Sequence, residues 1–412
     1  MLYIYNFIIL FAAQILKFVA LFSPKIKLFV NGRSTVFSEL KQKIHKSDKT
    51  IWFHAASLGE YEQGLPVIQG LKSKFPAHKI IITFFSPSGY EVRKNNTIAD
   101  VTLYLPLDTI KNARKFIEIA NPEFVFFIKY EFWPNYLREL KSKNINTYLI
   151  SGILRKDQRF FKWYGGFFRK GLFAFTHFFV QNERSKVLLQ DIGFQNVTLS
   201  GDTRFDRVAA ILEQNNQLDF ISNFKNNSPL IVIGSSWEQD EKLWLEYINS
   251  TTNKVKFIIA PHNIYPEKNT NFIEKCNKKT VLFSQKESKN LEEFQVFIID
   301  TIGILTKIYA YSDLAYVGGG FGNPGVHNIL EPATFGVPVL IGPNYSHFAE
   351  ATALVQTKGC TVISNQLELK NAVDFLLQNE VERMEQGHIC ETFIQMNKGA
   401  THKIVTYFEN HF

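Results

Sequence analysis

Short apolar runs recur along this chain, and polar segments of helical length separate them. The runs are continuous rather than alternating, which is typical of parallel strands buried on both faces of a sheet. Their regular alternation with helical segments predicts an α/β protein with doubly wound sheets. In the first half the predicted strands are Thr50–Phe53, Lys79–Phe85, Val101–Leu105, Phe124–Lys129, Thr147–Ile150, Phe178–Val180 and Val197–Leu199. In the second half they are Leu230–Ile233, Lys256–Ile259, Val281–Phe283, Val296–Ile299, Leu314–Val317, Val337–Ile341 and Thr361–Ile363.

The break between these two series predicts the domain organisation. Residues 213–228 are rich in Asn and Gln, so we interpret them as a linker. The flanking segments 31–212 and 229–412 can each bury a full core, because the chain has 412 residues of which 45% are apolar. We expect the two domains to face each other across a cleft, with function on loops at the carboxyl ends of the strands.

The first 30 residues predict a separate apolar helix. Leu2–Phe22 is apolar apart from a few polar residues, and Ser23-Pro24 closes it. Its length, about 21 residues, is enough to cross a bilayer. Asn6 and Lys17 lie about three helical turns apart and so share one face. A narrow polar stripe of this kind also suits a helix that lies in the membrane interface.

Three interpretations of this helix stay open: it spans a membrane, lies in the interface, or packs on the protein's own core. We expect no removable signal peptide, because no charged region precedes the helix and no convincing small-residue cleavage site follows it. Lys25, Lys27 and Arg33 follow directly, and such positive flanks favour the cytoplasmic side and attract anionic lipid. Both membrane interpretations leave the remaining chain in the cytoplasm.

The charge balance narrows the class of partner. The formal net charge is +8, from 46 basic and 38 acidic residues, which suits nucleic acid, anionic lipid or a phosphorylated substrate. Nucleic acid is the least favoured of these, because the chain has no basic block and no known nucleic-acid-binding motif. The three cysteines are widely spaced and form neither a metal pattern nor a disulfide framework, which fits a reducing compartment.

The stretch Ala315–Ala351 carries the strongest local signal for a binding site. A predicted strand runs into the glycines at 318–320, 322 and 325, and a helix is predicted to open near Val326–Glu331. A strand, a glycine loop and a helix in this order place backbone N–H groups where they can hold a phosphate. Three side chains in the first turn of that helix can reach a sugar or nucleotide: His327, Asn328 and Glu331. The alternative is a tight turn that binds nothing.

A candidate general base follows the first predicted strand. His54 and Glu60 flank a turn of small residues at the carboxyl end of that strand, where a base is expected. Ser57 can cap the helix that Glu60 begins, and the pair also fits a capping box, which is a purely structural use.

Two more loops of the first half carry charged candidates. Glu131 directly follows a buried strand and lies between Tyr130 and Trp133, so its carboxylate is expected to be poorly solvated. Arg204, in the loop Gly201–Asp206, is placed to stabilise a developing anion. A structural ion pair is the alternative for each residue.

Loops of the second half are expected to meet beside the glycine loop at one sheet edge. They carry small hydroxyl residues, a histidine or a glycine at a helix start, and together they predict a nucleotide pocket. These loops are Gly234–Glu241, Ala260–Asn263 and Asp300–Ile304.

The combination of motifs resembles the 3-deoxy-D-manno-octulosonic acid (Kdo) transferases of lipopolysaccharide assembly. In chain order the motifs are WFHAASLGE, YEFWPN, GDTRFD, SSWEQDE, APHN, DTIGIL and GGGFGNPGVHNILEPATFGVPVLIGP. The resemblance runs to about residue 365 and implies a GT-B fold, in which two Rossmann-like domains hold the active site between them. It implies transfer of Kdo from CMP-Kdo to a lipid A precursor, lipid IVA, at the cytoplasmic face of the inner membrane. No metal and no other cofactor is implied.

The resemblance also implies roles for matched residues. Glu60 matches the general base, while Glu131 and Arg204 match positions that support the transition state. Segments that match CMP contacts contribute Pro261, His262, Gly303, Ile304, Leu305, Asn328, Ile329, Leu330 and Glu331. Loop positions add His54, Ser57, Gly319, Gly320 and His327 to the expected substrate-binding set. The chain departs from the family pattern at Arg204, where Lys is usual, at Gly325-Val326, where two glycines are usual, and at Ile153-Leu154-Arg155, where Arg-Leu-Ser is expected.

Two rival functions remain at this stage. One is a GT-B enzyme for another nucleotide sugar, or a sugar-nucleotide epimerase of similar architecture; CMP-Kdo and UDP-sugars as substrates would separate them. The other is a non-enzymatic, membrane-tethered nucleotide-binding module. Glu60 and Glu131 at strand ends argue against the latter, because simple phosphate binding would not place anions there.

Overall fold

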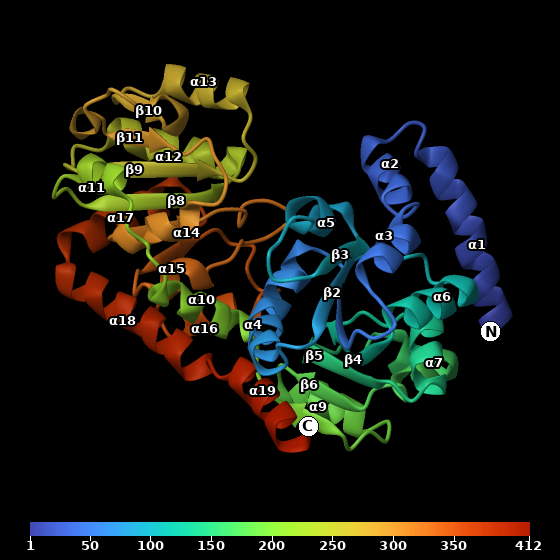
Figure 1. The fold of residues 1–412 in the computed structure, drawn as a ribbon. Helices are drawn as coiled ribbons and strands as arrows, with labels where there is room; N and C mark the ends of the chain where they lie inside the picture. Colours follow the sequence, from blue (N-terminus) through green and yellow to red (C-terminus); the bar gives the residue numbers. More distant parts are fainter. The chain divides into compact units, whose positions relative to one another are not determined.

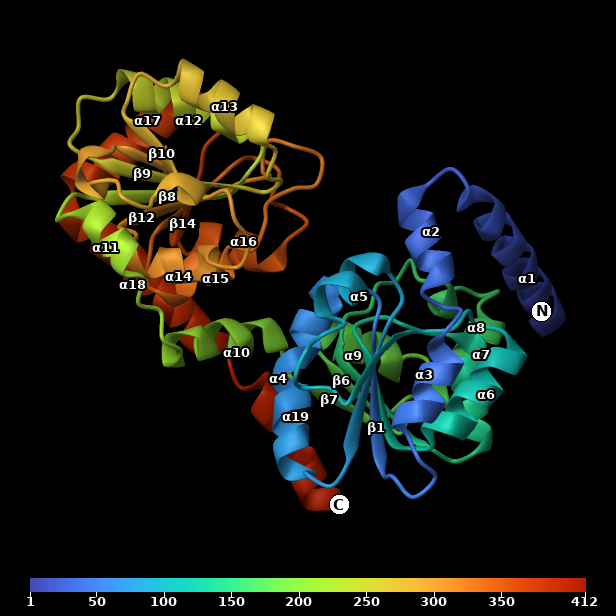
Figure 2. The same ribbon diagram turned by 45° about the horizontal axis from the view of Figure 1, so that its top comes forward.

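The computed structural model describes all of residues 1–412, and the chain folds into two compact units. The first unit comprises Met1–Arg207 and Asn397–Phe412, and the second comprises Val208–Met396. Each unit is built on one seven-stranded sheet in which all neighbouring strands are parallel and helices cover the faces (Figures 1 and 2). The expected α/β class, with two doubly wound sheets, is confirmed.

The sheet of the first unit has the strand order β3-β2-β1-β4-β5-β6-β7. Its strands are β1 (Thr50–Ala55), β2 (Lys79–Phe84), β3 (Val101–Tyr104), β4 (Pro122–Ile128), β5 (Asn146–Gly152), β6 (His177–Val180) and β7 (Val197–Leu199). The covering helices are α3 (Val36–Lys43), α4 (Leu58–Lys74), α5 (Pro87–Arg93), α6 (Ile110–Ala120), α7 (Pro134–Ser142), α8 (Gly166–Leu172), α9 (Glu183–Gln190) and α10 (Thr203–Ala209). The strand order reverses between β1 and β4, so the loops after these two strands meet at the topological switch point, where α/β sheets bind ligands.

The second sheet repeats this arrangement with the order β10-β11-β9-β8-β12-β13-β14. Its strands are β8 (Leu230–Ser236), β9 (Lys256–Pro261), β10 (Thr280–Leu282), β11 (Val296–Ile298), β12 (Leu314–Val317), β13 (Val339–Ile341) and β14 (Cys360–Val362). Its helices are α11 (Asp219–Lys225), α12 (Glu238–Ser250), α13 (Pro266–Lys275), α14 (Leu305–Ile308), α15 (Leu330–Thr334), α16 (Ala349–Gln356), α17 (Gln366–Gln378) and α18 (Glu380–Asn397). The switch point lies between β8 and β12, so the loop at Trp237 and the glycine loop lie next to each other.

The observed boundaries differ from the expected domains at both ends of the second half. The C-terminal helix α19 (Ala400–His411) belongs to the first unit, because Phe408 packs 5.3 Å from the ring of Phe126 and 4.7 Å from that of Tyr148. The segment 213–228, expected to be a linker, contains α11, whose Ile221 and Phe224 are buried in the core of the second unit. The chain therefore passes between units after Arg207 and again after Met396.

The apolar N-terminal segment forms helix α1 (Leu2–Val19), and α2 (Pro24–Asn31) packs beside it (Figure 1). Ser23 ends the first helix and caps the second, because its hydroxyl accepts a hydrogen bond from the backbone N–H of Ile26. By length and composition α1 is the one helix able to cross a membrane. No residue of α1 is fully buried, so α1 lies on the surface of the first unit and not inside its core.

Candidate active site

His54, at the end of β1, is fully buried and bonded through both ring nitrogens. The indole N–H of Trp133 lies 3.1 Å from His54 Nε2, and an indole nitrogen can only donate. His54 Nε2 therefore accepts, and the ring proton sits on Nδ1, 2.9 Å from Thr83 Oγ1. We expected His54 to contact substrate; instead it positions the loop after β4, because neither nitrogen has a remaining hydrogen bond to give.

Glu131 is part of the same hydrogen-bonded group. Its Oε2 atom lies 3.0 Å from Trp133 Nε1 and 3.4 Å from His54 Nε2, so one indole N–H serves both side chains. The carboxylate side chain is 11% exposed. The loop after β4 thus presents a partly accessible carboxylate that accepts a hydrogen bond from the Trp133 indole.

Glu60 lies in the first turn of α4 and is 7% exposed. The hydroxyl of Ser57 donates to the Glu60 carboxylate. Ser57 occupies the N-cap position, but its side chain makes no capping bond to the backbone. The capping box that the sequence allowed is therefore absent, and the serine orients the carboxylate of Glu60 instead.

Tyr130 links the two carboxylates. Burial raises the pKa of the Tyr130 hydroxyl, and the negative charges of Glu60 and Glu131 raise it further, whereas Arg155 lowers it. The guanidinium of Arg155 lies 5.8 Å from the centre of the tyrosine ring. The loops after β1 and β4 therefore bring Glu60 and Glu131 to the same place, as the sequence predicts for adjacent strand ends.

Arg204 forms the structural ion pair that the sequence left open. Its Nη2 lies 2.8 Å and its Nε 2.9 Å from Asp202 Oδ2. The preceding residue, Thr203, hydrogen bonds to Ser151 at 2.6 Å and to the carbonyl oxygen of Gln63 at 2.5 Å. These bonds fix the start of α10 against helix α4, which carries Glu60.

The second unit contains a stack of three rings at the carboxyl ends of its strands. Trp237 follows β8, His262 follows β9, and His327 follows the glycine loop after β12. The centres of the two imidazoles lie 4.3 Å apart, and the indole of Trp237 is 4.8 Å from His262, all nearly parallel. His262 and His327 were expected to meet in one site, and they do. Trp237 was missed, although it stands inside the SSWEQDE motif.

Hydrogen bonding and burial keep His327 neutral. Trp237 Nε1 donates to His327 Nε2 at 2.7 Å, so the ring proton sits on Nδ1. Burial, together with the nearby His262, lowers the pKa of His327 to about 4. Burial also lowers the pKa of His262. The site thus offers neutral imidazoles, which can donate a hydrogen bond to an anionic ligand without carrying full charge.

Asp240 is the hub of this site and was not among the expected residues. It is completely buried and accepts hydrogen bonds from the backbone N–H of Trp237 at 2.8 Å and of Gly319 at 2.9 Å, and from the Tyr316 hydroxyl at 2.5 Å. The carboxylate therefore joins the start of α12, strand β12 and the glycine loop. The sequence contains a signal for this role, because an acidic residue three positions after Trp237 can cap α12.

The glycine loop is a close-packed turn. The N–H of Gly318 bonds to the Gly234 carbonyl at 2.9 Å, and the N–H of Gly319 bonds to Asp240. A Cβ on Gly319 would lie 2.4 Å from the Gly325 carbonyl oxygen, and one on Gly320 would lie 2.7 Å from Gly342. The expectation of bare N–H groups along this loop is therefore wrong for Gly318 and Gly319.

The helix after this loop starts later than expected. Helix α15 begins at Leu330, so His327 and Asn328 lie in the loop before it and only Glu331 lies in its first turn. The side-chain oxygen of Asn328 accepts a hydrogen bond at 3.2 Å from the N–H of Leu330, the first residue of the helix. Glu331 accepts from Asn328 at 3.0 Å and from Thr306 at 2.8 Å.

The bond between Glu331 and Thr306 brings together two segments that were expected to contact CMP. Thr306 lies in α14, directly after Gly303, Ile304 and Leu305. Gly303 has a φ of +94° and no neighbour that a Cβ would meet, so its backbone conformation alone favours glycine there. Pro261 ends β9 beside His262. The expected donor-site residues of the second unit therefore occupy neighbouring loops.

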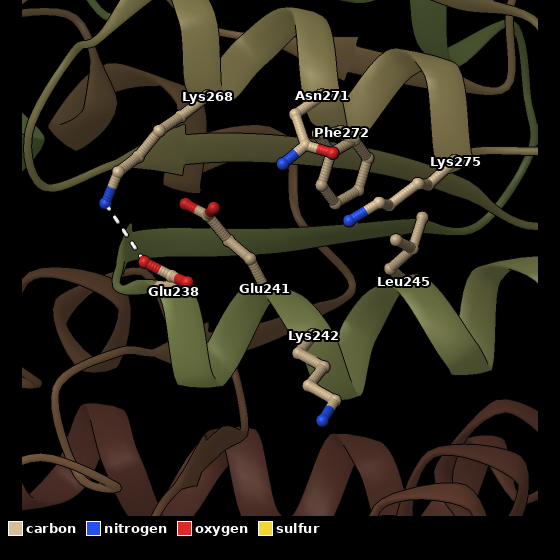
Figure 3. A pocket seen from close by; sticks show the side chains of 8 residues that line it. All are labelled: Glu238, Glu241, Lys242, Leu245, Lys268, Asn271, Phe272 and Lys275. Carbon is tan, nitrogen blue, oxygen red and sulfur yellow. Dashed lines mark hydrogen bonds and ion pairs between the residues drawn. The ribbon is translucent and has the colours of Figure 1, made fainter.

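A separate groove of about 370 Å³ lies between α12 and α13, and of the expected pocket segments only Gly234–Glu241 reaches it, through Glu238 and Glu241 (Figure 3). It is lined mainly by charged side chains, and Lys268 bridges to Glu238 at 3.2 Å across its mouth. The chain contains no group of three or more His, Cys, Asp or Glu side chains placed to hold a metal ion.

A family model matches part of the first unit, and relatives among known proteins align with most of the chain. Residues 32–207 match the family model described as 3-Deoxy-D-manno-octulosonic-acid transferase (kdotransferase). The chain is 26% identical to the 3-deoxy-D-manno-octulosonic acid transferase of Chlamydophila psittaci over 375 residues, 87% of this chain and 86% of that protein. It is 28% identical to the Aquifex aeolicus protein of the same name over 355 residues, 83% of this chain and 90% of that one.

Among solved structures, UDP-GlcNAc 2-epimerase from Neisseria meningitidis bound to UDP-GlcNAc matches with a TM-score of 0.61. The two proteins are 15% identical over 88% of this chain and 100% of that chain, so the match concerns the fold. Two parallel doubly wound sheets, one in each unit, give the chain a GT-B-like fold. The chain is therefore similar to the Kdo transferases over most of its length, and residues 32–207 match that family's model.

Proposed function

We propose that this protein transfers Kdo from CMP-Kdo to the lipid A precursor lipid IVA, with inversion at the anomeric carbon. The observation that carries the proposal is the carboxylate of Glu60, which is nearly buried, oriented by Ser57 and close to Tyr130 beside a second carboxylate. A site of this kind suits proton abstraction from a neutral hydroxyl. The names of the relatives support Kdo as the transferred sugar.

In the proposed reaction Glu60 removes the proton of an acceptor hydroxyl as its oxygen attacks the anomeric carbon of Kdo. The new glycosidic C–O bond forms as the bond to the CMP phosphate oxygen breaks, and CMP leaves from the opposite face as an anion. Because the leaving group is stable as an anion at neutral pH, no acid has to protonate it. The transition state resembles an oxocarbenium ion, which the carboxylate of Glu131 favours.

The donor is assigned to the second unit. His327 presents Nδ1–H to the anionic donor, because its other nitrogen is bonded to Trp237. The loops at Pro261–His262, Gly303–Leu305 and Asn328–Glu331 surround the same strand ends and contact the CMP moiety. Arg204, in the first unit, supplies positive potential to the leaving phosphate, moderated by its pairing with Asp202. No metal or other cofactor takes part.

The acceptor and the membrane are assigned to the first unit. Lipid IVA carries acyl chains and phosphates, so an apolar helix flanked by Lys25 and Lys27 suits the surface that delivers it. We assign the protein to the cytoplasmic face of the inner membrane, in contact with anionic lipid and without a nucleic-acid partner.

The test is an assay of the purified full-length protein with CMP-Kdo and lipid IVA dispersed in detergent, with products resolved by mass. One or more Kdo additions to lipid IVA are expected, also when EDTA is present. Parallel reactions with UDP-GlcNAc measure transfer and epimerisation. Turnover of UDP-GlcNAc without turnover of CMP-Kdo would overturn the proposal in favour of the epimerase alternative.

A further inference from the structure

Helix α1 leaves most of its large apolar side chains exposed, and its half-buried side holds a mixture of apolar, small and polar residues. The half-buried positions recur at helical spacing and contain Leu2, Tyr5, Asn6, Ile9, Ala12, Ala13 and Leu16. The exposed positions contain Met1, Tyr3, Ile4, Phe7, Ile8, Leu10, Phe11, Ile15 and Phe18, and also Gln14 and Lys17. Most of this exposed face is apolar, which is unfavourable in water and favours an apolar environment.

The N-terminal end of α1 is fixed to the core of the first unit. The Tyr5 hydroxyl donates to Asp108 Oδ2 at 2.7 Å, and Asn135 Nδ2 donates to Asn6 Oδ1 at 3.0 Å. Asp108 is 1% exposed and also accepts from the backbone N–H groups of Asn135 and Tyr136 at the start of α7. The polar residues near this end of α1 are therefore used to attach it to the unit.

The C-terminal end of α1 lies on the same unit. Its last turns pack against α2, where Ala13, Leu16 and Lys17 line a groove of about 300 Å³ together with Phe29 and Arg33. Figure 1 shows α1 lying along α2 and reaching α6 and α7 near its N-terminus. Both ends of α1 therefore contact the first unit, and they do so on the same side of the helix.

Charged and interfacial residues surround this apolar face. Lys25 and Lys27 of α2 are exposed, and the segment at 155–164 adds Arg155, Lys156 and Arg159. Trp163 and Tyr164 of that segment are 93% and 56% exposed. The ring of Phe167, in the helix that follows, lies 5.9 Å from Tyr5, which connects this segment to α1. Exposed Trp, Tyr and cations beside an apolar face match the chemistry of an anionic bilayer surface.

From this geometry we propose that α1 lies parallel to the membrane plane, with its exposed apolar face in one leaflet of an anionic bilayer and its inner face on the first unit. It does not span the bilayer. Spanning would break the bonds of Tyr5 and Asn6 or draw Asp108 and its polar surroundings into hydrocarbon, where unpaired polar groups are costly. The inference rests on the proposed membrane location but not on the proposed reaction.

The test measures the depth of α1 residue by residue. In the full-length protein with Cys276→Ser, single cysteines at Tyr3, Phe11, Phe18 and Ala13 are labelled with an environment-sensitive fluorophore. The protein is bound to vesicles of phosphatidylethanolamine and phosphatidylglycerol that carry lipid quenchers at graded depths. A flat helix predicts the same shallow depth at Tyr3, Phe11 and Phe18 and little quenching at Ala13. A depth that is greatest at Phe11, with equal quenching at Ala13, indicates spanning and would overturn the inference.

A partition measurement supplies the matched control. Phe11→Ser is expected to lower the vesicle partition constant roughly tenfold, because binding follows the buried apolar area. Val381→Ser, at an equally apolar exposed site of the second unit, is expected to leave it unchanged. Unaltered partition of Phe11→Ser would also overturn the inference. Transfer to detergent-dispersed lipid IVA, assayed on the same preparations, shows separately whether the proposed reaction stands.

Discussion

The indole N–H of Trp237 lies 2.7 Å from Nε2 of His327 and sets the tautomer of that histidine. The two rings are nearly parallel and His262 stacks on both, which restrains the direction of the bond. The ring proton of His327 is therefore on Nδ1, which in the proposed function is the nitrogen available to the donor. A tryptophan that touches no substrate can in this way determine how the donor is held.

Replacing Trp237 by Phe tests this relationship. The variant keeps the stacked ring and loses the N–H, so His327 is free to adopt either tautomer. The KM for CMP-Kdo is expected to rise about three- to tenfold, the worth of one hydrogen bond, with a smaller change in kcat. Trp244→Phe is the control, because the Trp244 indole N–H is buried in the same unit without a partner. An equal rise in KM in both variants would contradict the assignment.

Glu60→Gln tests the proposed base. The amide keeps the shape of the side chain but cannot take a proton, so kcat is expected to fall by about two to four orders of magnitude while CMP binding persists. Glu62→Gln is the matched control on the same helix. Its carboxylate pairs with Arg93 at 2.7 Å and Arg207 at 2.5 Å, so the change should lower stability rather than turnover. Near-normal turnover of Glu60→Gln would remove Glu60 from its role.

The pH dependence of stability is expected to reflect His177. Burial, together with the neighbouring His411, lowers the pKa of His177 to about 4, against 6.5 for an ordinary histidine. Between these values the unfolded chain binds more protons, so the free energy of unfolding falls as the pH falls from 6.5 toward 4. His177→Gln should flatten this dependence in urea unfolding curves, whereas the exposed His388→Gln should not. Superimposable pH profiles of wild type and His177→Gln would exclude the effect.

The sequence predicts the two sheets well because their strands are continuous apolar runs buried on both faces, such as Ile51–Phe53. The sequence does not predict that α19 packs on the first unit. Its apolar residues Ile404 and Phe408 are buried in the core of that unit, but the sequence does not show which core they join. The domain boundaries therefore differ from those expected, although the strands do not.

The sequence also predicts only part of the candidate site. Residues that follow strands, such as Glu60, Glu131 and His327, fall at the switch points because parallel strand ends share an edge. The sequence cannot show which polar groups are already engaged. His54 and the N–H of Gly319 looked free for a ligand, yet Trp133 and Asp240 occupy them. Such pairings join residues far apart in the chain and follow only from the tertiary structure.

Gly319→Ala tests whether the close packing of the glycine loop is needed for stability and for binding of CMP-Kdo. Gly319 has a φ of +92°, and a Cβ there would lie 2.4 Å from the Gly325 carbonyl oxygen and 2.9 Å from His327 Cδ2. Gly193 is the matched control, because its φ is +96° and a Cβ would meet nothing within 4 Å. Gly193→Ala should cost only the backbone strain of about 1–2 kcal/mol in the free energy of unfolding.

Gly319→Ala should cost more than this control, because backbone must move to admit the methyl group. It should also raise the KM for CMP-Kdo, since the displaced His327 loses its bond to Trp237. Urea unfolding and steady-state kinetics of the two variants separate these effects. If both variants lose the same stability and both keep the wild-type KM, the contact between Gly319 and His327 has no part in holding the donor.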